Sequence, residues 1–222
     1  MTERVILKED RFFAVSAPDG SMRADGPDGH GLWWGDTRFL SEYHLLIDGR
    51  EPEPVKVQVE AGWVVLELAA GALLVRRERY VDSGMHERIT ITNPGPRQTD
   101  NDLEIAHDAD YAAMLTVRGI VPQTAAASSV RVTEVILRPP GVHQRLELDP
   151  GQVFVLEVDV LAEPAHESAT FEAGLDRIRS EYRQWSPDCA TFETDNPALN
   201  ELLRRSRDDM RMLCDFYPTG KA

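Results

Sequence analysis

The stretch Gly31-Leu-Trp-Trp-Gly-Asp-Thr-Arg-Phe-Leu-Ser41 carries the most structural information in this chain. It places a charged Asp-Thr-Arg triplet among large apolar side chains, so we expect most of the stretch to be buried. Asp36 and Arg38 lie two residues apart and would point to the same face of a β-strand. A buried charge costs free energy unless it is paired and hydrogen-bonded. We therefore predict that both side chains are mostly buried. They either form an Asp–Arg pair that pins a strand to a neighbouring loop, or they contact a ligand directly.

The tryptophans of the same stretch, Trp33 and Trp34, allow two interpretations, as does Trp63 further along the chain. Exposed rings could stack on sugar rings, whereas buried rings would pack in the core, where large aromatic side chains contribute much of the apolar area. Core packing is the favoured interpretation. Exposure of the Trp33-Trp34 pair would reverse it.

Outward from this stretch, short apolar segments alternate with Gly and Pro turns as far as about residue 162. Many short strands between such turns indicate an antiparallel sandwich or barrel, and no long helical pattern separates them. The expected strands are Phe12–Ser16, Tyr43–Ile47, Val55–Val59, Trp63–Leu68, Leu73–Val81, His86–Thr92, Leu103–Ala106, Met114–Arg118, Val130–Leu137, His143–Leu148 and Val153–Leu161. The Ala/Ser-rich run at 124–129 is expected to be a loop.

The pattern becomes helical after Pro164. One helical face is formed by Phe171, Leu175, Ile178, Tyr182 and Trp185, which are spaced by three or four residues, and Pro187 should end that helix. A second helix should begin at Asn196-Pro197, with asparagine as N-cap and proline in the first turn. It should run to about Phe216, and Pro218 and Gly220 should stop it. Its apolar stripe consists of Leu199, Leu202, Leu203, Met210 and Leu213.

These patterns predict a mainly β protein, an antiparallel β-sandwich followed by two C-terminal α-helices. We expect the sandwich to occupy residues 1–163 and the helices to lie within residues 164–222. The second helix should pack against the first and leave part of its stripe to a partner chain, which would give weak homodimers.

Composition narrows the choice of partners and compartment. The chain has 24 Lys and Arg against 38 Asp and Glu, a net charge of −14, and no basic run. Neither a nucleic acid nor an anionic membrane is therefore an expected partner. Cys189 and Cys214 are too few for a disulfide framework or a zinc site. The N-terminus does not resemble a signal peptide, and no apolar run is long enough to span a membrane, so we expect a cytoplasmic protein.

Possible catalytic and metal-binding residues are few. His107-Asp108-Ala-Asp110 has neither zinc nor calcium spacing. His86 and Arg88 should share one face of a strand with Glu87 opposite, which does not form an acid–base pair. The sequence has no nucleophile elbow and no Gly-rich phosphate loop. We therefore predict no catalytic residue, no metal site and no cofactor.

Several segments together resemble the N-terminal domain of bacterial proteins related to glycogen debranching enzyme, of the amylo-α-1,6-glucosidase type. The most specific is Asp-Thr-Arg-Phe-Leu-Ser at 36–41, followed by Tyr43, Leu45 and Asp48-Gly49. Further matching segments are Arg11–Ser16 with Asp19-Gly20, His86-Glu-Arg88 before Thr92-Asn93, and Asp110-Tyr111 before Val117-Arg118-Gly119. The sequence departs from the family pattern after Gly119, where it is short and Ala/Ser-rich.

This resemblance implies a supersandwich-like β-domain in which Asp110 makes a structural hydrogen bond. It also implies that glycosidase chemistry belongs to a C-terminal (α/α)-barrel. The segment Phe192–Leu213 resembles the first helix of that barrel, and the rest of the barrel is absent from this chain, so no catalytic residue transfers.

Three functional interpretations follow. The leading one is a non-catalytic domain that supports the catalytic barrel of a debranching-type glycosidase and walls one side of its glucan cleft. The first alternative is a free-standing α-glucan-binding module, in which Trp33, Trp34, Asp36, Arg38 or Asp110 could contact the glucan. The second alternative is an enzyme of another type, built around His107–Asp110.

Overall fold

The computed structural model describes residues 4–24, 29–122, 135–162, 170–185, 187 and 189–214. The strands are β1 Val5–Glu9, β2 Phe12–Ser16, β3 Gly31–Trp34, β4 Thr37–Leu40, β5 Glu42–Ile47, β6 Glu53–Glu60, β7 Trp63–Ala70, β8 Leu73–Val81, β9 Gly84–Thr92, β10 Thr99–Asp108, β11 Ala112–Ala113, β12 Val135–Arg138, β13 His143–Leu148 and β14 Val153–Ala162. The helices are α1 Met114–Val117, α2 Phe171–Trp185 and α3 Pro197–Leu213.

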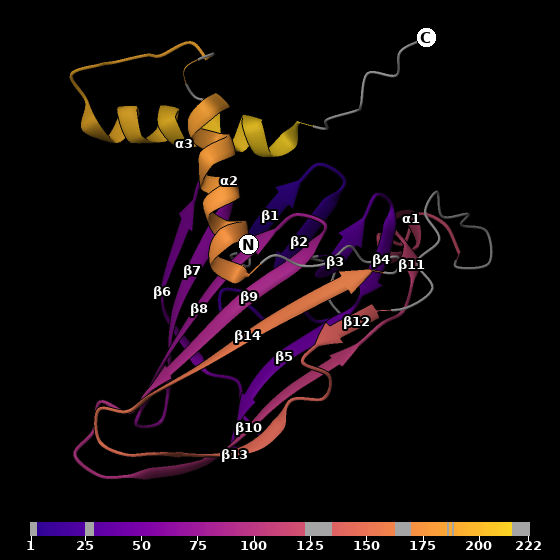
Figure 1. Ribbon diagram of the computed structural model, residues 1–222. Helices are drawn as coiled ribbons and strands as arrows, with labels where there is room; N and C mark the ends of the chain where they lie inside the picture. Colours follow the sequence, from indigo (N-terminus) through magenta and orange to yellow (C-terminus); the bar gives the residue numbers. More distant parts are fainter. Residues whose placement is uncertain are drawn as a thin grey trace.

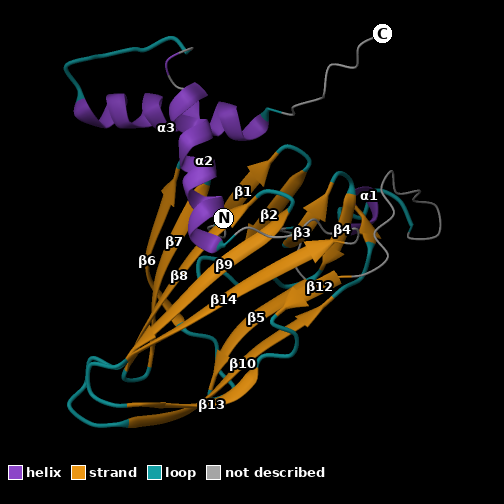
Figure 2. Ribbon diagram, viewed as in Figure 1, coloured by secondary structure: helices purple, strands orange, loops and turns teal. Residues whose placement is uncertain are grey.

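The strands form three antiparallel sheets, which Figures 1 and 2 show with α2 and α3 above them. The largest has the order β12-β14-β9-β8-β7-β6. A five-stranded sheet, β1-β2-β3-β4-β11, and a three-stranded sheet, β13-β10-β5, make the other two. The last two are joined where the chain passes from β4 to β5, and the backbone N–H of Ser41 donates to the carbonyl of Asp108 there at 2.9 Å. The prediction of a mainly antiparallel β fold with two C-terminal helices is confirmed.

One hydrophobic core joins all three sheets, as a sandwich requires. Its members include Val75 and Ile89 of the six-stranded sheet, Leu32 and Phe39 of the five-stranded sheet, and Leu103 of β10. Alternation explains this arrangement, because β8 and β9 each bury every second residue on the side that faces the other sheets. The period-two pattern in the sequence thus marks the inner face of the sandwich.

Helix α2 covers the outer face of the six-stranded sheet, where a second and smaller core forms. Phe171, Leu175, Ile178 and Tyr182 of the helix pack with Tyr80 of β8. These are the residues that the helical spacing predicts to share a face, and the bounds Phe171–Trp185 agree with the prediction.

Helix α3 lies across α2 at one end of the sandwich (Figure 1). The side chain of Asn196 accepts hydrogen bonds from the backbone N–H groups of Ala198 and Leu199 at 3.0 and 3.3 Å, which confirms the predicted N-cap. The helix extends to Leu213 in the described part of the chain, and the expected stop signals at Pro218 and Gly220 lie outside it.

Some elements were assigned wrongly or missed in the sequence. Met114–Arg118 was predicted as a strand, but Met114–Val117 forms a single helical turn. Ala113 is paired with Thr37, the first residue of β4, so no strand remains beyond it to pair with, and the N–H of Met114 binds the turn carbonyl of Asp36 at 2.7 Å. Strand β1 was not among the expected strands although it pairs with β2 over its full length, and β3, β4 and β11 were not among them either. The expected loop at 124–129 and the first part of the strand Val130–Leu137 lie outside the described residues.

Candidate functional site

The quoted motif folds as the hairpin β3–β4, with Gly35 and Asp36 in the turn between the two strands. The expectation that Asp36 and Arg38 share a strand face is therefore corrected, because Asp36 lies in the turn and only Arg38 lies in a strand. Asp36 is half-buried rather than buried. Its side chain accepts a long hydrogen bond from the Thr37 hydroxyl at 3.4 Å.

Arg38 is the buried member of the motif, with 4% of its surface exposed. Its Nε lies 3.2 and 3.1 Å from the two carboxylate oxygens of Asp110, and its Nη2 also donates to Asp110. Its Nη1 donates to the backbone carbonyl of His30 at 3.1 Å. The guanidinium therefore ties the β3–β4 hairpin to the segment between β10 and β11.

The glycine that opens the motif is explained by the same arginine. Gly31 has φ +138°, and a Cβ atom placed on it would lie 2.5 Å from Cδ of Arg38. Only a residue without a side chain lets Arg38 cross the strand at this distance.

The tryptophans of the motif pack against phenylalanines of β2. Trp33 is buried and lies parallel to Phe13 with ring centroids 5.5 Å apart, and Trp34 stacks on Phe12 at 5.1 Å. Trp63 belongs to the small core under α2. A buried ring offers no face to a sugar, so Trp33 is not a stacking platform in this structure.

A charged cluster that sequence reasoning did not identify lies inside the sandwich. Glu87 is fully buried and binds Arg77 and Arg79 of β8, with N–O distances of 2.7 to 3.0 Å. The hydroxyl of Tyr43 on β5 donates to the same carboxylate at 2.8 Å. Burial alone would raise the pKa of Glu87, but the two guanidinium groups lower it to about 2.

The cluster holds two positive charges against one negative charge, and the turn after β2 supplies the missing acceptors. Arg77 donates to the carbonyl of Asp19 at 2.6 Å, and Arg79 donates to the carbonyl of Gly20 at 2.9 Å. Gly20 has φ +84°, and a Cβ atom there would lie 2.8 Å from Nη1 of Arg77. The Asp19-Gly20 dipeptide is thus fixed by its contact with the buried arginines.

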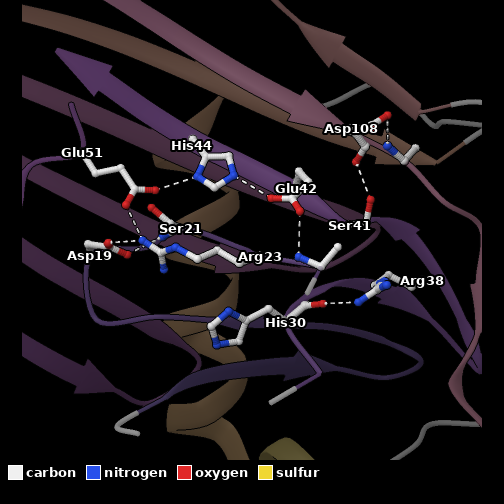
Figure 3. A network of polar contacts seen from close by, with 12 residues as sticks. Asp19, Ser21, Arg23, His30, Arg38, Ser41, Glu42, His44, Glu51 and Asp108 are labelled. Atoms are coloured by element: carbon white, nitrogen blue, oxygen red, sulfur yellow. Dashed lines mark hydrogen bonds and ion pairs between the residues drawn. The ribbon is translucent and has the colours of Figure 1, made fainter. Parts of the chain in front are cut away.

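A second polar network runs over the surface of β5 (Figure 3). Arg23 binds Asp19 at 2.8 Å and also binds Glu51. The imidazole of His44 lies between two carboxylates, 2.6 Å from Glu51 and 2.7 Å from Glu42. These contacts hold the turn at Asp19 against the β5 edge, so the buried and surface networks meet at that turn.

A similar arrangement surrounds His86 under α2. Its ring nitrogens lie 2.6 Å from Asp159 and 2.7 Å from Asp82. Burial alone would lower the pKa of His86, but the two carboxylates raise it to about 9. The pKa of Asp82 is about 2, because His86 and Arg177 outweigh the effect of its burial. His86 and Glu87 lie on opposite faces of β9, as the alternation predicts.

The His107–Asp110 segment is divided between two environments. His107 and Asp108 are exposed, whereas Asp110 binds Arg38 and accepts a hydrogen bond from the N–H of Ala112 at 3.2 Å. Across the described residues, no group of three or more His, Cys, Asp or Glu is placed to hold a metal ion.

The most unusual surface is the outward face of α3. The helix packs on β1 and α2, with Arg211 as its only buried residue. Arg211 binds Glu9 at 2.9 Å and lies over the ring of Tyr182 at 5.1 Å. We expected α3 to pack on α2 and to leave part of its apolar stripe to a partner chain. In the structure Leu202, Met210 and Leu213 are 59%, 58% and 68% exposed, so most of the stripe is uncovered. An amphipathic helix here packs through its polar face and turns its apolar face outward.

The family described as the N-terminal domain of (some) glycogen debranching enzymes matches residues 7–180. This chain belongs to that family. No curated protein matches the chain significantly. The range that matches this family includes the Asp-Thr-Arg hairpin, both networks at the Asp19 turn and most of α2. It ends before α3. Among the described residues, no helix has both the length and the apolar composition needed to span a bilayer.

Proposed function

We propose that the chain is a non-catalytic β-sandwich domain that supports the catalytic domain of a glycogen-debranching-type glycosidase, and so serves α-glucan metabolism. The observation that carries the proposal is the outward apolar stripe of α3 in a chain of the debranching-enzyme N-terminal family. The occupant of that stripe would be the helical catalytic domain, which the resemblance places after the β-domain.

The dimensions of the stripe suit a helix–helix interface. Leu199, Leu202, Met210 and Leu213 recur on one side of α3, and the stripe from Leu199 to Leu213 is about 21 Å long at 1.5 Å per residue. Burying one such side chain contributes roughly 1.5–3 kcal/mol, so leaving the stripe in water is unfavourable. A neighbouring helix with its own apolar stripe would cover it by ridges-into-grooves packing.

The two acids whose pKa values are lowered to about 2 are unsuited to act as the general acid of a glycosidase. A general acid needs a pKa raised towards neutrality. Glu87 and Asp82 have pKa values of about 2 and are held by positively charged partners. We therefore propose that catalysis belongs to the neighbouring domain, and that this chain alone does not hydrolyse glycogen, starch or pullulan. Release of reducing sugar that is lost on mutation within this chain would contradict the proposal.

The supporting role can be tested in trans. A debranching-enzyme catalytic domain lacking its own N-terminal domain would be mixed with this chain, and its melting temperature and activity on glycogen would be measured. Both should rise with the parent chain and rise less with Leu202→Ser/Leu213→Ser. Val55→Ser is the matched control, because Val55 is as exposed but lies on β6. An equal effect of all three proteins, or no effect of any, would refute the docking role.

A second candidate is an α-glucan-binding module, which a cleft of about 550 Å³ favours. The cleft is bordered by Asp10 and Phe12 near the β1–β2 turn, by Asp82, and by Arg177 and Glu181 of α2. Carboxylates and guanidinium groups beside an aromatic ring can bind sugar hydroxyl groups and the apolar face of a sugar. Electrophoresis of this chain in gels containing glycogen separates the candidates, since only a binding module is retarded without a catalytic domain.

A further inference from the structure

A basic groove lies between α2, α3 and the β6–β7 turn, on the side of α3 that faces the sandwich. Its volume is about 330 Å³. Arg179 and Arg183 of α2 line it, as do Arg204 and Arg207 of α3. Trp63 and Tyr182 supply its aromatic lining.

The charge of the groove is opposite to that of the chain. The whole protein carries −14, yet four arginines line this groove against two acids, Glu60 and Asp208. Arg204 and Arg179 also pair with Glu201 and Asp176 beside the groove, and Arg207 pairs with Asp208, so Arg183 is the lining arginine that has no acidic partner in the described chain. Like charges held together in one concavity repel each other unless a counter-charge is bound. An anion bound beside Arg183 would supply its missing counter-charge.

Three donor groups on residues that line the groove have no protein acceptor in the described chain. Within the described residues Arg183 forms no hydrogen bond or ion pair, and it is exposed. The Nε atom of Arg207 is buried and has no hydrogen-bond partner there. Tyr182 is only 5% exposed, and its hydroxyl is likewise without a partner in that part of the chain. An unpaired buried donor costs free energy that a ligand acceptor would recover.

The other two arginines are held in place. Arg179 lies over the ring of Trp63, 4.5 Å from its centroid. Arg204 is fixed by Glu201 at 2.6 Å and by Asp208 at 3.0 Å. The groove therefore combines oriented guanidinium groups with donors that have no protein acceptor.

We propose that this groove binds a phosphate monoester carried on a small organic group. Planar guanidinium groups bind phosphate oxygens through two parallel hydrogen bonds, and a phosphate monoester carries a charge close to −2 near neutral pH. The guanidinium of Arg183, which has no acidic partner in the described chain, would bind the phosphate in this way. Trp63 and Tyr182 form an apolar surface for the organic part of the ligand. The groove is separate from the outward stripe of α3, so the proposed anion site and the proposed docking role can be tested independently.

Isothermal titration calorimetry of the full chain at low ionic strength tests the proposal. Sodium phosphate and glucose 1-phosphate should each bind at one site, and uncharged glucose should not bind. Arg183→Gln should weaken binding about tenfold or more, the loss expected for one charge-assisted hydrogen bond. Arg183 is exposed and has no protein partner in the described chain, so this variant should keep the parent's melting temperature. Arg207→Gln is a second variant that removes a donor of the groove.

Arg205→Gln is the matched control. Arg205 also lies on α3 and is exposed, but it does not line the groove. Its substitution removes the same charge and should change affinity by less than about twofold, as expected for a remote surface charge. The proposal is overturned if neither phosphate compound binds the parent chain, or if Arg183→Gln and Arg205→Gln weaken binding equally.

Discussion

Arg38 and Asp110 form an ion pair across 72 residues of sequence, and the pair closes the β3–β4 hairpin onto the segment after β10. Arg38 is buried, whereas the carboxylate of Asp110 is partly exposed. Asp110 also caps the start of β11 by accepting from Ala112. The Asp-Thr-Arg motif is thus a structural connection between two parts of the five-stranded sheet.

Removing either partner of this pair should destabilise the domain. Asp110→Ala leaves the buried guanidinium of Arg38 without its counter-charge, at a cost of about 3–5 kcal/mol. Arg38→Ala leaves a carboxylate that is partly exposed and can be hydrated, so its cost in charge should be smaller. The double variant should lose less than the sum of the two, since both substitutions break the same interaction. Denaturant unfolding monitored by tryptophan fluorescence measures all three. Arg145→Ala is a control, because that exposed arginine pairs with Asp100 at the surface. Strict additivity would show that the two residues act separately.

The Glu87 cluster should make the domain sensitive to acid. The folded-state pKa of Glu87, about 2, is below the ordinary value of 4.5, so its stabilisation is complete above pH 4.5 and is lost as the pH falls towards 2. Glu87→Gln leaves two buried arginines without a counter-charge and should be strongly destabilising at neutral pH. Between pH 5 and 2 its melting temperature should fall less steeply than that of the parent chain. Parallel curves would show that Glu87 does not contribute to acid unfolding.

His86 should give the opposite pH dependence. Its folded-state pKa, about 9, exceeds the ordinary 6.5, so the stabilisation is complete below pH 6.5 and is lost as the pH rises through 9. The free energy of unfolding of the parent chain should therefore decrease between pH 6.5 and pH 9. His86→Gln should lack this decrease, and His107→Gln, at an exposed position, should retain it. An NMR titration of the His86 ring that gives a pKa near 6.5 would refute the proposed ion pairs of His86 with Asp82 and Asp159.

Local patterns in the sequence predicted most of the elements, because burial on one face imposes a period of two or of 3.6. Leu73–Val81 and His143–Leu148 were predicted at their observed bounds for this reason, and so was helix Phe171–Trp185. The misses occur where a partner distant in sequence decides the structure. The helical turn begins at Met114 because β4 does not extend past Thr37, the partner of Ala113. No property of the Met114 segment itself reveals this.

The charged sites show the same limit. That Arg38 would be buried followed from its apolar neighbours, but its partner Asp110 is brought close only by the fold. A signal for the interior cluster was present, since Arg77 and Arg79 lie on the same strand face as the inward residues Val75 and Val81. Their common partner Glu87 lies on the next strand, where only the register of β8 and β9 places it opposite Arg79.

The outward stripe of α3 should make the isolated chain self-associate. Leu202 and Leu213 are both more than half exposed, while the polar face of the helix is occupied by its contacts with Glu9 and Tyr182. Without a neighbouring domain, two copies can bury their stripes against each other in an antiparallel, two-fold arrangement. We expect weak dimers whose population rises with protein concentration in sedimentation velocity experiments.

Substitution of the stripe should abolish this association. Leu202→Asp places a charge where two copies would meet, and it should give a monomer at every concentration with an unchanged melting temperature, since Leu202 is exposed in the single chain. Val55→Asp introduces the same charge at an exposed position on β6 and should leave the dimer intact. Dimers that persist in Leu202→Asp would place the contact elsewhere on the molecule. A parent chain that stays monomeric at high concentration would show that the stripe does not drive self-association.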